Sequence, residues 1–302
     1  MMVSVVILAL AVVWDLCLGE PPSGVHPVCW MGRWIDCLWS RRPPTGLSLL
    51  IYGGGIVLSG GGACWALGNA VSQLPLILFV PLSAWLLKGS ASASALWEAG
   101  RSVRNALKRD LRRARRELGT HLVSRDTRLL SRSEVAGAAV ESLTENLADG
   151  WVAPLMAYAL FGLSGALVYR FVNTCDSMLG YRYGDFELGG KAAARLDDLL
   201  SYLPSRVASA LLLLGAASEG LNWRRGLRTV LSQHRRTASP NAGWPMAAMA
   251  GALGVTLSKR GVYRLCGGPH QPGIDHLSST MAVLTRAQGM MVVLAALLVL
   301  AS

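Results

Sequence analysis

Long apolar runs that carry no charged side chain constrain the fold of this chain more than any other feature. The segment from Leu47 to Val71 has no charged residue and is long enough to cross a bilayer, which takes about 20 helical residues. Inside hydrocarbon every backbone amide and carbonyl must find a partner within the protein, so such runs fold as helices. Apolar residues make up 52% of the chain and charged residues 16%, and the mean hydropathy is +0.39. The sequence therefore predicts an all-α, polytopic membrane helical bundle rather than a soluble enzyme.

Several further apolar runs bring the expected number of spans to about five to seven. The expected spans are 1–18, 47–71, 74–87, 152–172, 203–217, 242–257 and 287–302. The first run has no basic residue before it and no small-residue cleavage pattern after it, which predicts a retained span rather than a signal peptide. The small residues at 89–95 are expected to lengthen the short 74–87 helix. The glycine triplets 53–55 and 60–62 predict close helix contact, because a phosphate loop would need a Lys-Ser/Thr ending.

Charge is distributed unevenly along the chain. The formal net charge is +11, and 11 of the 29 Lys and Arg residues lie between Arg101 and Arg132. In an apolar chain this pattern indicates positively charged cytoplasmic loops rather than nucleic-acid binding. From Glu98 the spacing predicts an amphipathic helix, either lying on the anionic membrane surface or forming part of a substrate site. We expect one membrane domain, 1–302, in the cell membrane, with a cytoplasmic helical insertion at 98–150.

The cysteine and histidine patterns exclude several classes of site. The six cysteines form no C-x-x-C pair and mostly lie in or beside apolar runs, which indicates small buried hydrophobes in a reducing compartment. No pair of histidines has a metal-binding spacing such as H-x-x-x-H, and no G-x-S-x-G elbow is present. A zinc or serine hydrolase is therefore not expected.

Four acidic residues recur at helical spacing ahead of the 152–172 run. They are Glu134, Glu141, Glu145 and Asp149. At 3.6 residues per turn all four fall on one narrow face, where like charges at i,i+4 repel one another. Such a face needs counter-ions. It is either a solvated surface paired with the Arg-rich helix before it, or part of a functional site that holds a metal.

A second polar group follows the same apolar run. Asn173 and Asp176 lie one helical turn apart, and ionisable groups at membrane depth are costly enough to suggest function. The nearby residues Arg182, Lys191, Arg195, Asp197 and Asp198 add cations and carboxylates. Carboxylate and amide oxygens suit Mg²⁺, and cations beside them suit phosphoryl transfer. The alternative for Asp197 and Asp198 is a helix N-terminal turn, where acids are favoured by the helix dipole.

Two isolated residues are further candidate ligand contacts. Asn241, in a Ser-Pro-Asn turn, either caps the helix that follows or contacts a ligand. His26, before Pro27, is a candidate ligand or base, although a single loop histidine more often serves neither role.

Six segments in order along the chain resemble the CobD/CbiB family of cobalamin biosynthesis. They are DLCLGEPPSGVHPVCWMGRWID (Asp15 to Asp36), SRDTRLL (Ser124 to Leu130), ESLTENLADGWVAPL (Glu141 to Leu155), YRFVNTCDSMLGYR (Tyr169 to Arg182), ARLDDLLSYLPSR (Ala194 to Arg206) and SPNAGWPMAAMAGALGV (Ser239 to Val255). The resemblance covers nearly the whole length. Ser201 is a departure, since many members are expected to have Asn there.

The resemblance implies an adenosylcobinamide-phosphate synthase. Such an enzyme joins the ring D propionate of adenosylcobyric acid to 1-aminopropan-2-ol, or more readily its O-phosphate, as an amide. Because a carboxylate and an amine do not condense unaided in water, activation by ATP with Mg²⁺ is the expected route. Other late cobalamin-pathway membrane enzymes are conceivable partners, besides the lipid bilayer.

The expected roles combine the resemblance with the residue chemistry. Glu141, Glu145 and Asp176 are the candidate catalytic groups. The candidate metal ligands are Asp149, Asp176, Asp197 and Asp198. Asn146, Asn173, Arg182, Lys191, Arg195, Asn241 and His26 are the candidate contacts to substrate or phosphate.

Both acidic groups must face the cytoplasm if ATP is used there. A simple crossing at 152–172 would separate them, so we expect this run to bend near Gly162-Leu163-Ser164-Gly165, or to lie buried, and so bring both groups to one cavity. Two other functions remain open: a Mg²⁺-dependent prenyl- or phosphotransferase, and a non-catalytic membrane sensor like the AmpE proteins.

Overall fold

The computed structural model describes residues 1–44 and 46–301, most of which are helical. The chain forms two compact units, each built from separate stretches of sequence. Unit one comprises 1–92, 153–201 and the end of the chain from 292, and unit two comprises 93–152 and 202–291. The last helix, α14 (Ile274–Ala301), contributes to both. The predicted all-α, polytopic membrane architecture is confirmed, because several of these helices are long and apolar enough to span a bilayer.

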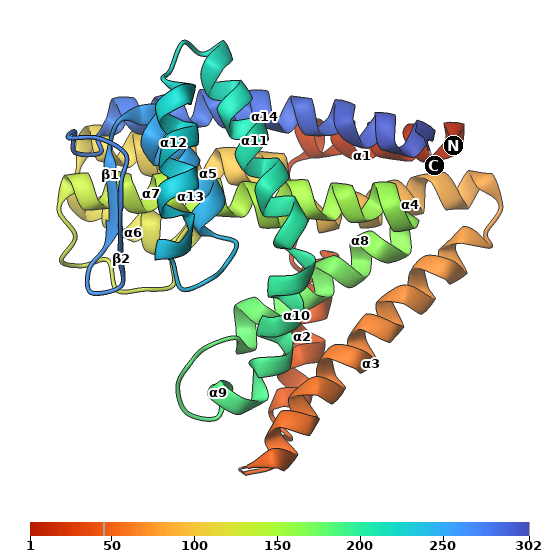
Figure 1. The fold of residues 1–302 in the computed structure, drawn as a ribbon. Coiled ribbons are helices and arrows are strands. Elements are labelled where there is room, and N and C mark those ends of the chain that lie inside the picture. Colours follow the sequence, from red (N-terminus) through yellow and green to blue (C-terminus); the bar gives the residue numbers. More distant parts are fainter. Residues whose placement is uncertain (45, 302) are drawn as a thin grey trace. The chain divides into compact units, whose positions relative to one another are not determined.

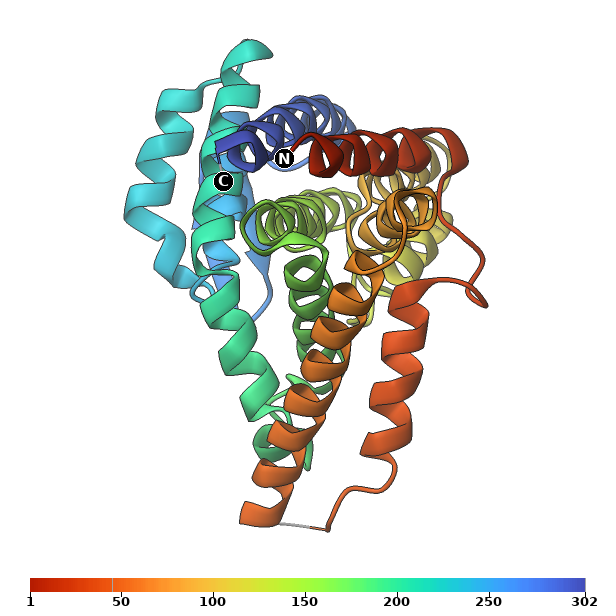
Figure 2. The ribbon, with the colours of Figure 1, turned by 90° about the vertical axis from the view of Figure 1, so that its right-hand side faces the viewer.

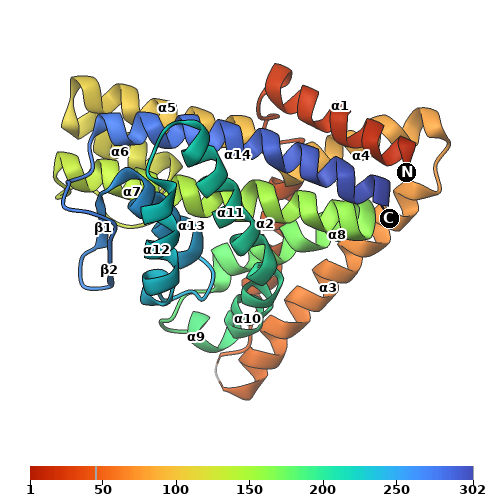
Figure 3. The same ribbon diagram turned by 45° about the horizontal axis from the view of Figure 1, so that its top comes forward.

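Unit one is a group of helices arranged around α3 and α8. Its helices are α1 (Met2–Leu18), α2 (Pro27–Trp39), α3 (Leu47–Ser72), α4 (Leu76–Ser90), α8 (Ala153–Leu179), α9 (Phe186–Gly189) and α10 (Lys191–Leu200). Figure 3 shows α9 and α10 beside the first half of α3. The first glycine of each triplet allows a close approach to α3. A Cβ at Gly53 would collide with the carbonyl of Gly189 in α9, and one at Gly60 would collide with the ring of Phe171 in α8. The predicted close helix contact is thus confirmed at these two positions.

Helix α8 contains the bend that the sequence predicts. Gly162 has φ 64° and ψ −160°, a backbone conformation outside the helical region. Figure 1 shows the two halves of α8 turning back on each other at this point. Gly165 permits the turn, because a Cβ there would meet the carbonyl of Ala157 from the preceding half. The apolar run therefore does not continue as one straight helix.

Unit two is built around the buried helix α7. Its elements are α5 (Ala93–Arg109), α6 (Leu111–His121), α7 (Arg132–Leu147), the π-helical turn η1 (Ala148–Val152), α11 (Tyr202–Ser218), α12 (Trp223–Gln233), the 3₁₀ turn η2 (His234–Arg236), α13 (Gly243–Leu253), β1 (Thr256–Lys259), β2 (Tyr263–Cys266) and most of α14. A capping box between Ser131 and Glu134 starts α7. From Val135 to Thr144 every side chain of α7 is buried, so polar groups on it need partners inside the protein.

The basic amphipathic region differs from its prediction in two respects. It forms two helices, because Asp110 interrupts it and caps α6 by accepting hydrogen bonds from the amides of Arg112 and Arg113. Its apolar stripe is also covered by protein, since Val103 and Leu107 are completely buried in unit two. That stripe is therefore not available to enter a membrane.

The expected span at 242–257 is wrong. Helix α13 has only 11 residues and ends at Gly254, whose φ of 74° suits a left-handed C-cap. A bilayer crossing takes about 20 residues, so α13 is too short. The chain continues into an antiparallel hairpin in which Lys259 pairs with Tyr263. Figure 1 shows this hairpin at the end of unit two that holds α6 and α7.

Among the described residues, four helical stretches qualify as candidate spans, or five if the bent pair of 186–200 and 202–218 forms one. They are 47–72, 76–109, 132–179 and 274–301. The expected helix extension through 89–95 is interrupted, because α4 ends at Ser90 and Ala91 is extended. Helix α1 is apolar but has only 17 residues.

Candidate functional site

A buried hydrogen-bonded cluster joins the second half of α8 to α10 in unit one. Asn173 Nδ2 donates to Oδ1 of Asp197 at 3.2 Å, and Ser201 Oγ donates to Oδ2 of the same carboxylate at 3.5 Å. Tyr169 OH and Ser201 Oγ lie 2.9 Å apart. Asp197 is therefore held by a partner on each oxygen. Ser201, where the family resemblance suggests Asn, keeps a hydrogen-bonding group in contact with Asp197.

The predicted phosphate-binding cations line one hollow beside this cluster. The hollow measures about 250 Å³ and is formed by the loop after α8 together with α9 and α10. Arg182, Lys191 and Arg195 line it, with Asp198 and Glu187 among the other lining residues. Glycine at position 190 lets the start of α10 pack closely on the end of α8, because a Cβ there would collide with the carbonyl of Leu179. This arrangement supplies cations and a carboxylate at one place, which is what a phosphate and a divalent ion require.

Asp176 lies one turn after Asn173 and approaches the end of α8. A Cβ at Gly180 would fall against Oδ1 of Asp176, so glycine leaves room for this carboxylate. Asn173 and Asp176 therefore lie on α8, while Asp197 and Asp198 lie on α10 of the same unit.

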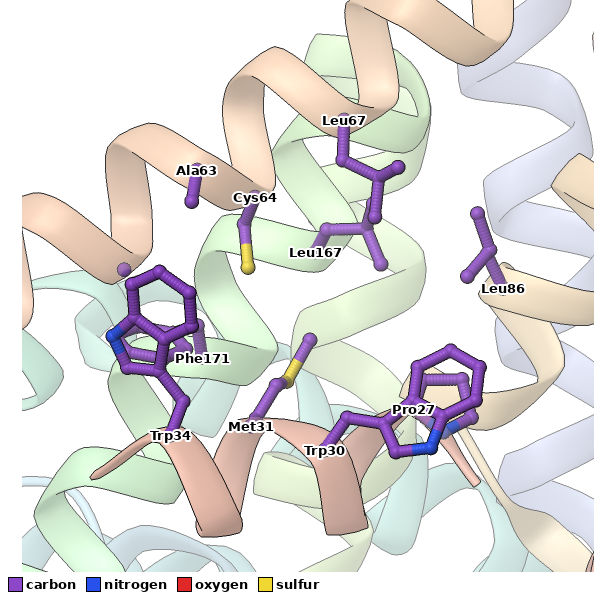
Figure 4. A pocket seen from close by; sticks show the side chains of 11 residues that line it. Pro27, Trp30, Met31, Trp34, Ala63, Cys64, Leu67, Leu86, Leu167 and Phe171 are labelled. Atoms are coloured by element: carbon purple, nitrogen blue, oxygen red, sulfur yellow. The ribbon is translucent and has the colours of Figure 1, made fainter. Parts of the chain in front are cut away.

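A second hollow in unit one is almost entirely apolar. It measures about 180 Å³ and lies among α2, α3, α4 and α8 (Figure 4). Trp30, Trp34 and Phe171 line it together with Met31 and Leu167, and no charged residue does. Because no charged side chain lines this hollow, it is less suited to a phosphate than the polar hollow is.

Unit two carries the other predicted acidic residues. Glu141, on α7, is 4% exposed, and its Oε2 lies 3.5 Å from Nη2 of Arg125. Its Oε1 is buried and accepts no hydrogen bond from the residues that the structure describes. Glu141, Glu145 and Arg125 line a hollow of about 170 Å³ with Lys259 and Tyr263 from the hairpin. A buried carboxylate oxygen facing a polar hollow is a ready acceptor for a cationic ligand group.

Tyr263 lies in the same hollow as Glu141 and Glu145. Its burial, together with the negative charges of Glu141 and Glu145, raises the pKa of the Tyr263 phenol above its ordinary value. The phenol therefore stays protonated across the physiological pH range and acts as a donor toward the Glu141 carboxylate.

Two carboxylates of the predicted acidic face have counter-ions that lie outside the Arg-rich helices. Glu134 forms an ion pair with Arg260 of the hairpin, and Glu141 pairs with Arg125 of the loop after α6. Asp149 lies in the π-helical turn η1 rather than in α7. Part of this face is therefore paired with basic side chains, and part of it lines a hollow.

Two further predicted residues make contacts within the protein. Asn146 Nδ2 donates to the carbonyl and hydroxyl oxygens of Ser142. Asn241 Oδ1 accepts from Arg206, while Ser239 receives the amides at the start of the turn, so Asn241 does not cap α13 through its side chain. Their contacts to ligand stay predictions.

His26 has both ring nitrogens occupied. Nδ1 accepts the amide of Val28 and thereby caps α2, and Nε2 lies 2.7 Å from Oε2 of Glu20. Because the Val28 amide requires an unprotonated Nδ1, Nε2 carries the proton and donates to Glu20. Contact with a phosphate would require His26 to give up one of these bonds.

Sequence reasoning did not find an ion cluster at the start of unit one. Lys88, on α4, is 2% exposed, and its Nζ lies 3.3 Å from Oε1 of Glu20 and 3.9 Å from Oδ1 of Asp15. Burial opposes ionisation of Glu20, but hydrogen bonds from His26 and Ser92 and the charge of Lys88 outweigh it and hold the pKa of Glu20 at about 2. Arg125, Lys259 and Tyr263 were also missed as site residues, although Arg125 lies within a segment that carried the family resemblance.

Within residues 1–44 and 46–301, no three His, Cys, Asp or Glu side chains are grouped as a complete metal site. Mg²⁺ commonly takes only one or two protein carboxylates and completes its shell with water and substrate phosphates. The carboxylates and amide of α8 and α10 are hard oxygen donors of this kind, so they fit a magnesium ion that arrives with phosphate.

These features define a polytopic membrane protein with polar hollows suited to phosphate and to a cationic group. A family described as CobD/Cbib protein matches residues 8–291, and the chain belongs to this family. It is 42% identical to a probable cobalamin biosynthesis protein CobD of Methanothermobacter thermautotrophicus over 283 residues, 91% of this chain and 90% of the relative. It is 39% identical to the cobalamin biosynthesis protein CobD of Dehalococcoides mccartyi over 291 residues, 94% and 93% of the two chains. No solved structure matches the chain.

Membership in this family makes the chain a membrane enzyme of cobalamin biosynthesis. The relatives named here are cobalamin proteins, so they give no support to the prenyltransferase or AmpE-like alternatives.

Proposed function

We propose that the chain is an ATP-dependent amide ligase that joins adenosylcobyric acid to 1-aminopropan-2-ol O-phosphate and yields adenosylcobinamide phosphate. The observation that carries the proposal is the polar hollow of unit one. There Arg182, Lys191 and Arg195 lie with Asp198 at the end of a buried carboxylate cluster. Family membership supplies the pathway, and the hollow supplies groups suited to ATP.

The reaction proceeds in two steps. A propionate oxygen of the corrinoid attacks the γ-phosphorus of ATP, so that an acyl phosphate forms and ADP leaves. The free amine then attacks the acyl carbon, inorganic phosphate leaves, and one amine proton passes to a base. Activation is needed because a free carboxylate is a poor acyl donor.

The cations of the polar hollow have a defined task in the first step. Arg182, Lys191 and Arg195 would bind phosphate oxygens and stabilise the charge that develops during transfer. Mg²⁺, when bound, would neutralise phosphate charge. Asn173 keeps the Asp197 carboxylate oriented through their 3.2 Å hydrogen bond.

The hollow of unit two suits the amine step. Glu141 presents a buried, unbonded oxygen, and Glu145 lines the same space. Two carboxylates would bind an ammonium group and accept its proton before attack. We further propose that the site faces the cytoplasm, where ATP is present, and that the cell membrane holds the protein.

The test is a reconstituted assay with protein purified in lipid nanodiscs. Adenosylcobyric acid, ATP and Mg²⁺ are supplied with either aminopropanol or its phosphate, and products are identified by mass. We expect adenosylcobinamide phosphate and ADP in equal amounts. Lys191→Gln and Arg195→Gln should raise the KM for ATP, whereas Arg128→Gln, at an exposed residue paired with Asp126, should not. No amide product with either amine would refute the proposal.

A further inference from the structure

Helix α12 has one face fixed against the protein. Arg225 Nε donates to the carbonyl of Gly251, and Gly226 packs so closely on α13 that a Cβ there would meet the carbonyl of Ala248. Thr229 and Val230 are buried on the same side. Asn222 caps the start of the helix by accepting the amide of Arg225. These contacts fix which side of α12 faces outward.

The outward side carries an apolar stripe that the described residues leave partly exposed. Trp223, Leu227 and Leu231 are spaced four residues apart and are 40%, 40% and 66% exposed. At 100° per residue they lie along one narrow strip of the helix surface. Figure 2 shows α12, in cyan, at the outer edge of unit two beside α11. Leaving three large apolar side chains in water is unfavourable, so this strip favours an apolar environment.

Basic residues border the apolar stripe. Arg224 and Arg228 are exposed next to it, and Arg235 and Arg236 follow in η2. The sequence has no Asp or Glu between Glu219 and Asp275, so no nearby acidic side chain of this segment can neutralise them. A partner that matches this helix must therefore offer an apolar layer and, directly beside it, anionic groups.

A bilayer with anionic lipids has that chemistry. We propose that α12 lies in the headgroup layer of the membrane, with Trp223, Leu227 and Leu231 in the acyl boundary and Arg224 and Arg228 on lipid phosphates. Amphipathic helices with basic and aromatic residues of this kind bind membrane interfaces, and tryptophan favours that depth. Lipid lies next to this helix surface, because the chain is itself a membrane protein. A nucleic acid would satisfy the arginines but leave the apolar stripe in water.

The test places an environment-sensitive dye at two positions of the same helix. Leu227→Cys and Ser232→Cys are each made in a full-length chain whose native cysteines are replaced by Ser, then labelled with a nitrobenzoxadiazole dye and reconstituted in nanodiscs. Folding is checked by gel filtration and circular dichroism. We expect blue-shifted emission at position 227 that brominated lipid chains quench, and markedly weaker quenching at position 232, which lies on the polar side.

The charge requirement is tested with two lipid mixtures. Quenching at position 227 should be stronger in discs that contain phosphatidylglycerol than in discs of phosphatidylcholine alone. The double variant Arg224→Gln/Arg228→Gln should lose that difference, because it removes the charges that attract anionic lipid. Water-like emission at 227 would overturn the proposal. Blue-shifted emission that brominated lipid does not quench would also overturn it, since a protein surface would then cover the stripe.

Discussion

Asn173 donates a hydrogen bond from Nδ2 to Oδ1 of Asp197 at 3.2 Å, and this contact joins α8 to α10. Both residues are only 9% exposed, so water cannot easily replace either side chain as the hydrogen-bond partner of the other. The bond connects the two sequence segments that carry the predicted phosphate chemistry. Its removal should therefore affect both stability and turnover.

Asn173→Ala should destabilise the protein by about 1–3 kcal/mol, because it leaves a buried carboxylate oxygen without its donor. Loss of orientation at Asp197 should also lower turnover by about 10- to 100-fold. Thermal unfolding and the ligase assay measure the two effects. Asn69→Ala is the control, since Asn69 is exposed on α3 and donates to the Trp65 carbonyl of its own helix. Equal behaviour of the two variants would contradict the role of Asn173.

Lys88 is expected to be among the most sensitive positions of unit one. Lys88→Met should cost about 3–5 kcal/mol, because it removes the cation from a buried ion cluster and leaves Asp15 and Glu20 without it. The double variant Lys88→Met/Glu20→Gln should recover part of this loss. Denaturation of all three variants gives the coupling energy. Strictly additive effects would show that the two side chains are not coupled.

Stability should depend on pH through Glu20. The pKa of its carboxyl is about 2 in the folded protein and 4.5 without the fold, so folding favours the ionised form. The contribution is complete above about 4.5 and is lost as pH falls from there toward about 2. Melting temperatures between pH 7 and pH 3 should fall less steeply for Glu20→Gln than for the unaltered chain. Parallel curves would contradict the assignment.

Gly162 is expected to control the bend in α8. Its φ of 64° and ψ of −160° form a combination open mainly to glycine, so Gly162→Ala should cost about 1–3 kcal/mol. Gly61→Ala, in α3, is the matched control, since its Cβ would enter open space and alanine favours a helix by roughly 0.5–1 kcal/mol. Thermal unfolding compares the two. A Gly162→Ala protein as stable as the control would argue for a straight helix.

The bend in α8 was predictable, because the sequence contains glycines that permit it and polar groups on both sides that a straight helix would separate. Gly162 and Gly165 interrupt an apolar run, and a straight crossing would separate two polar groups. The structure confirms the bend, and it places the acidic residues of α7 in unit two and those of α8 and α10 in unit one. That both groups serve one cavity stays a prediction.

The short helix α13 shows where apolar composition is ambiguous. A helix buried on all sides within a protein is as uniformly apolar as one that crosses a membrane. Only its length separates the two cases, and Gly254 ends α13 after 11 residues. The strands that follow are four residues each, too short for their alternation to be distinctive.

The partners of the acidic residues could not be derived from sequence spacing. Arg260 and Lys259 reach α7 only because the hairpin folds back on it, and Lys88 meets Glu20 only when α4 packs beside α1. Local periodicity placed Glu134, Glu141 and Glu145 on one helix, but it contained no information about which distant cations neutralise them.

The central claim is that ATP activates the corrinoid carboxylate as an acyl phosphate. Adenosylcobyric acid labelled with ¹⁸O in the ring D carboxyl tests it directly. Of the two carboxyl oxygens, one stays in the amide and the other leaves with the phosphate that ATP donated. We predict one ¹⁸O atom in the inorganic phosphate for each amide bond formed, detected by mass spectrometry. Amide formation with the label in AMP, or with unlabelled phosphate, would contradict the account.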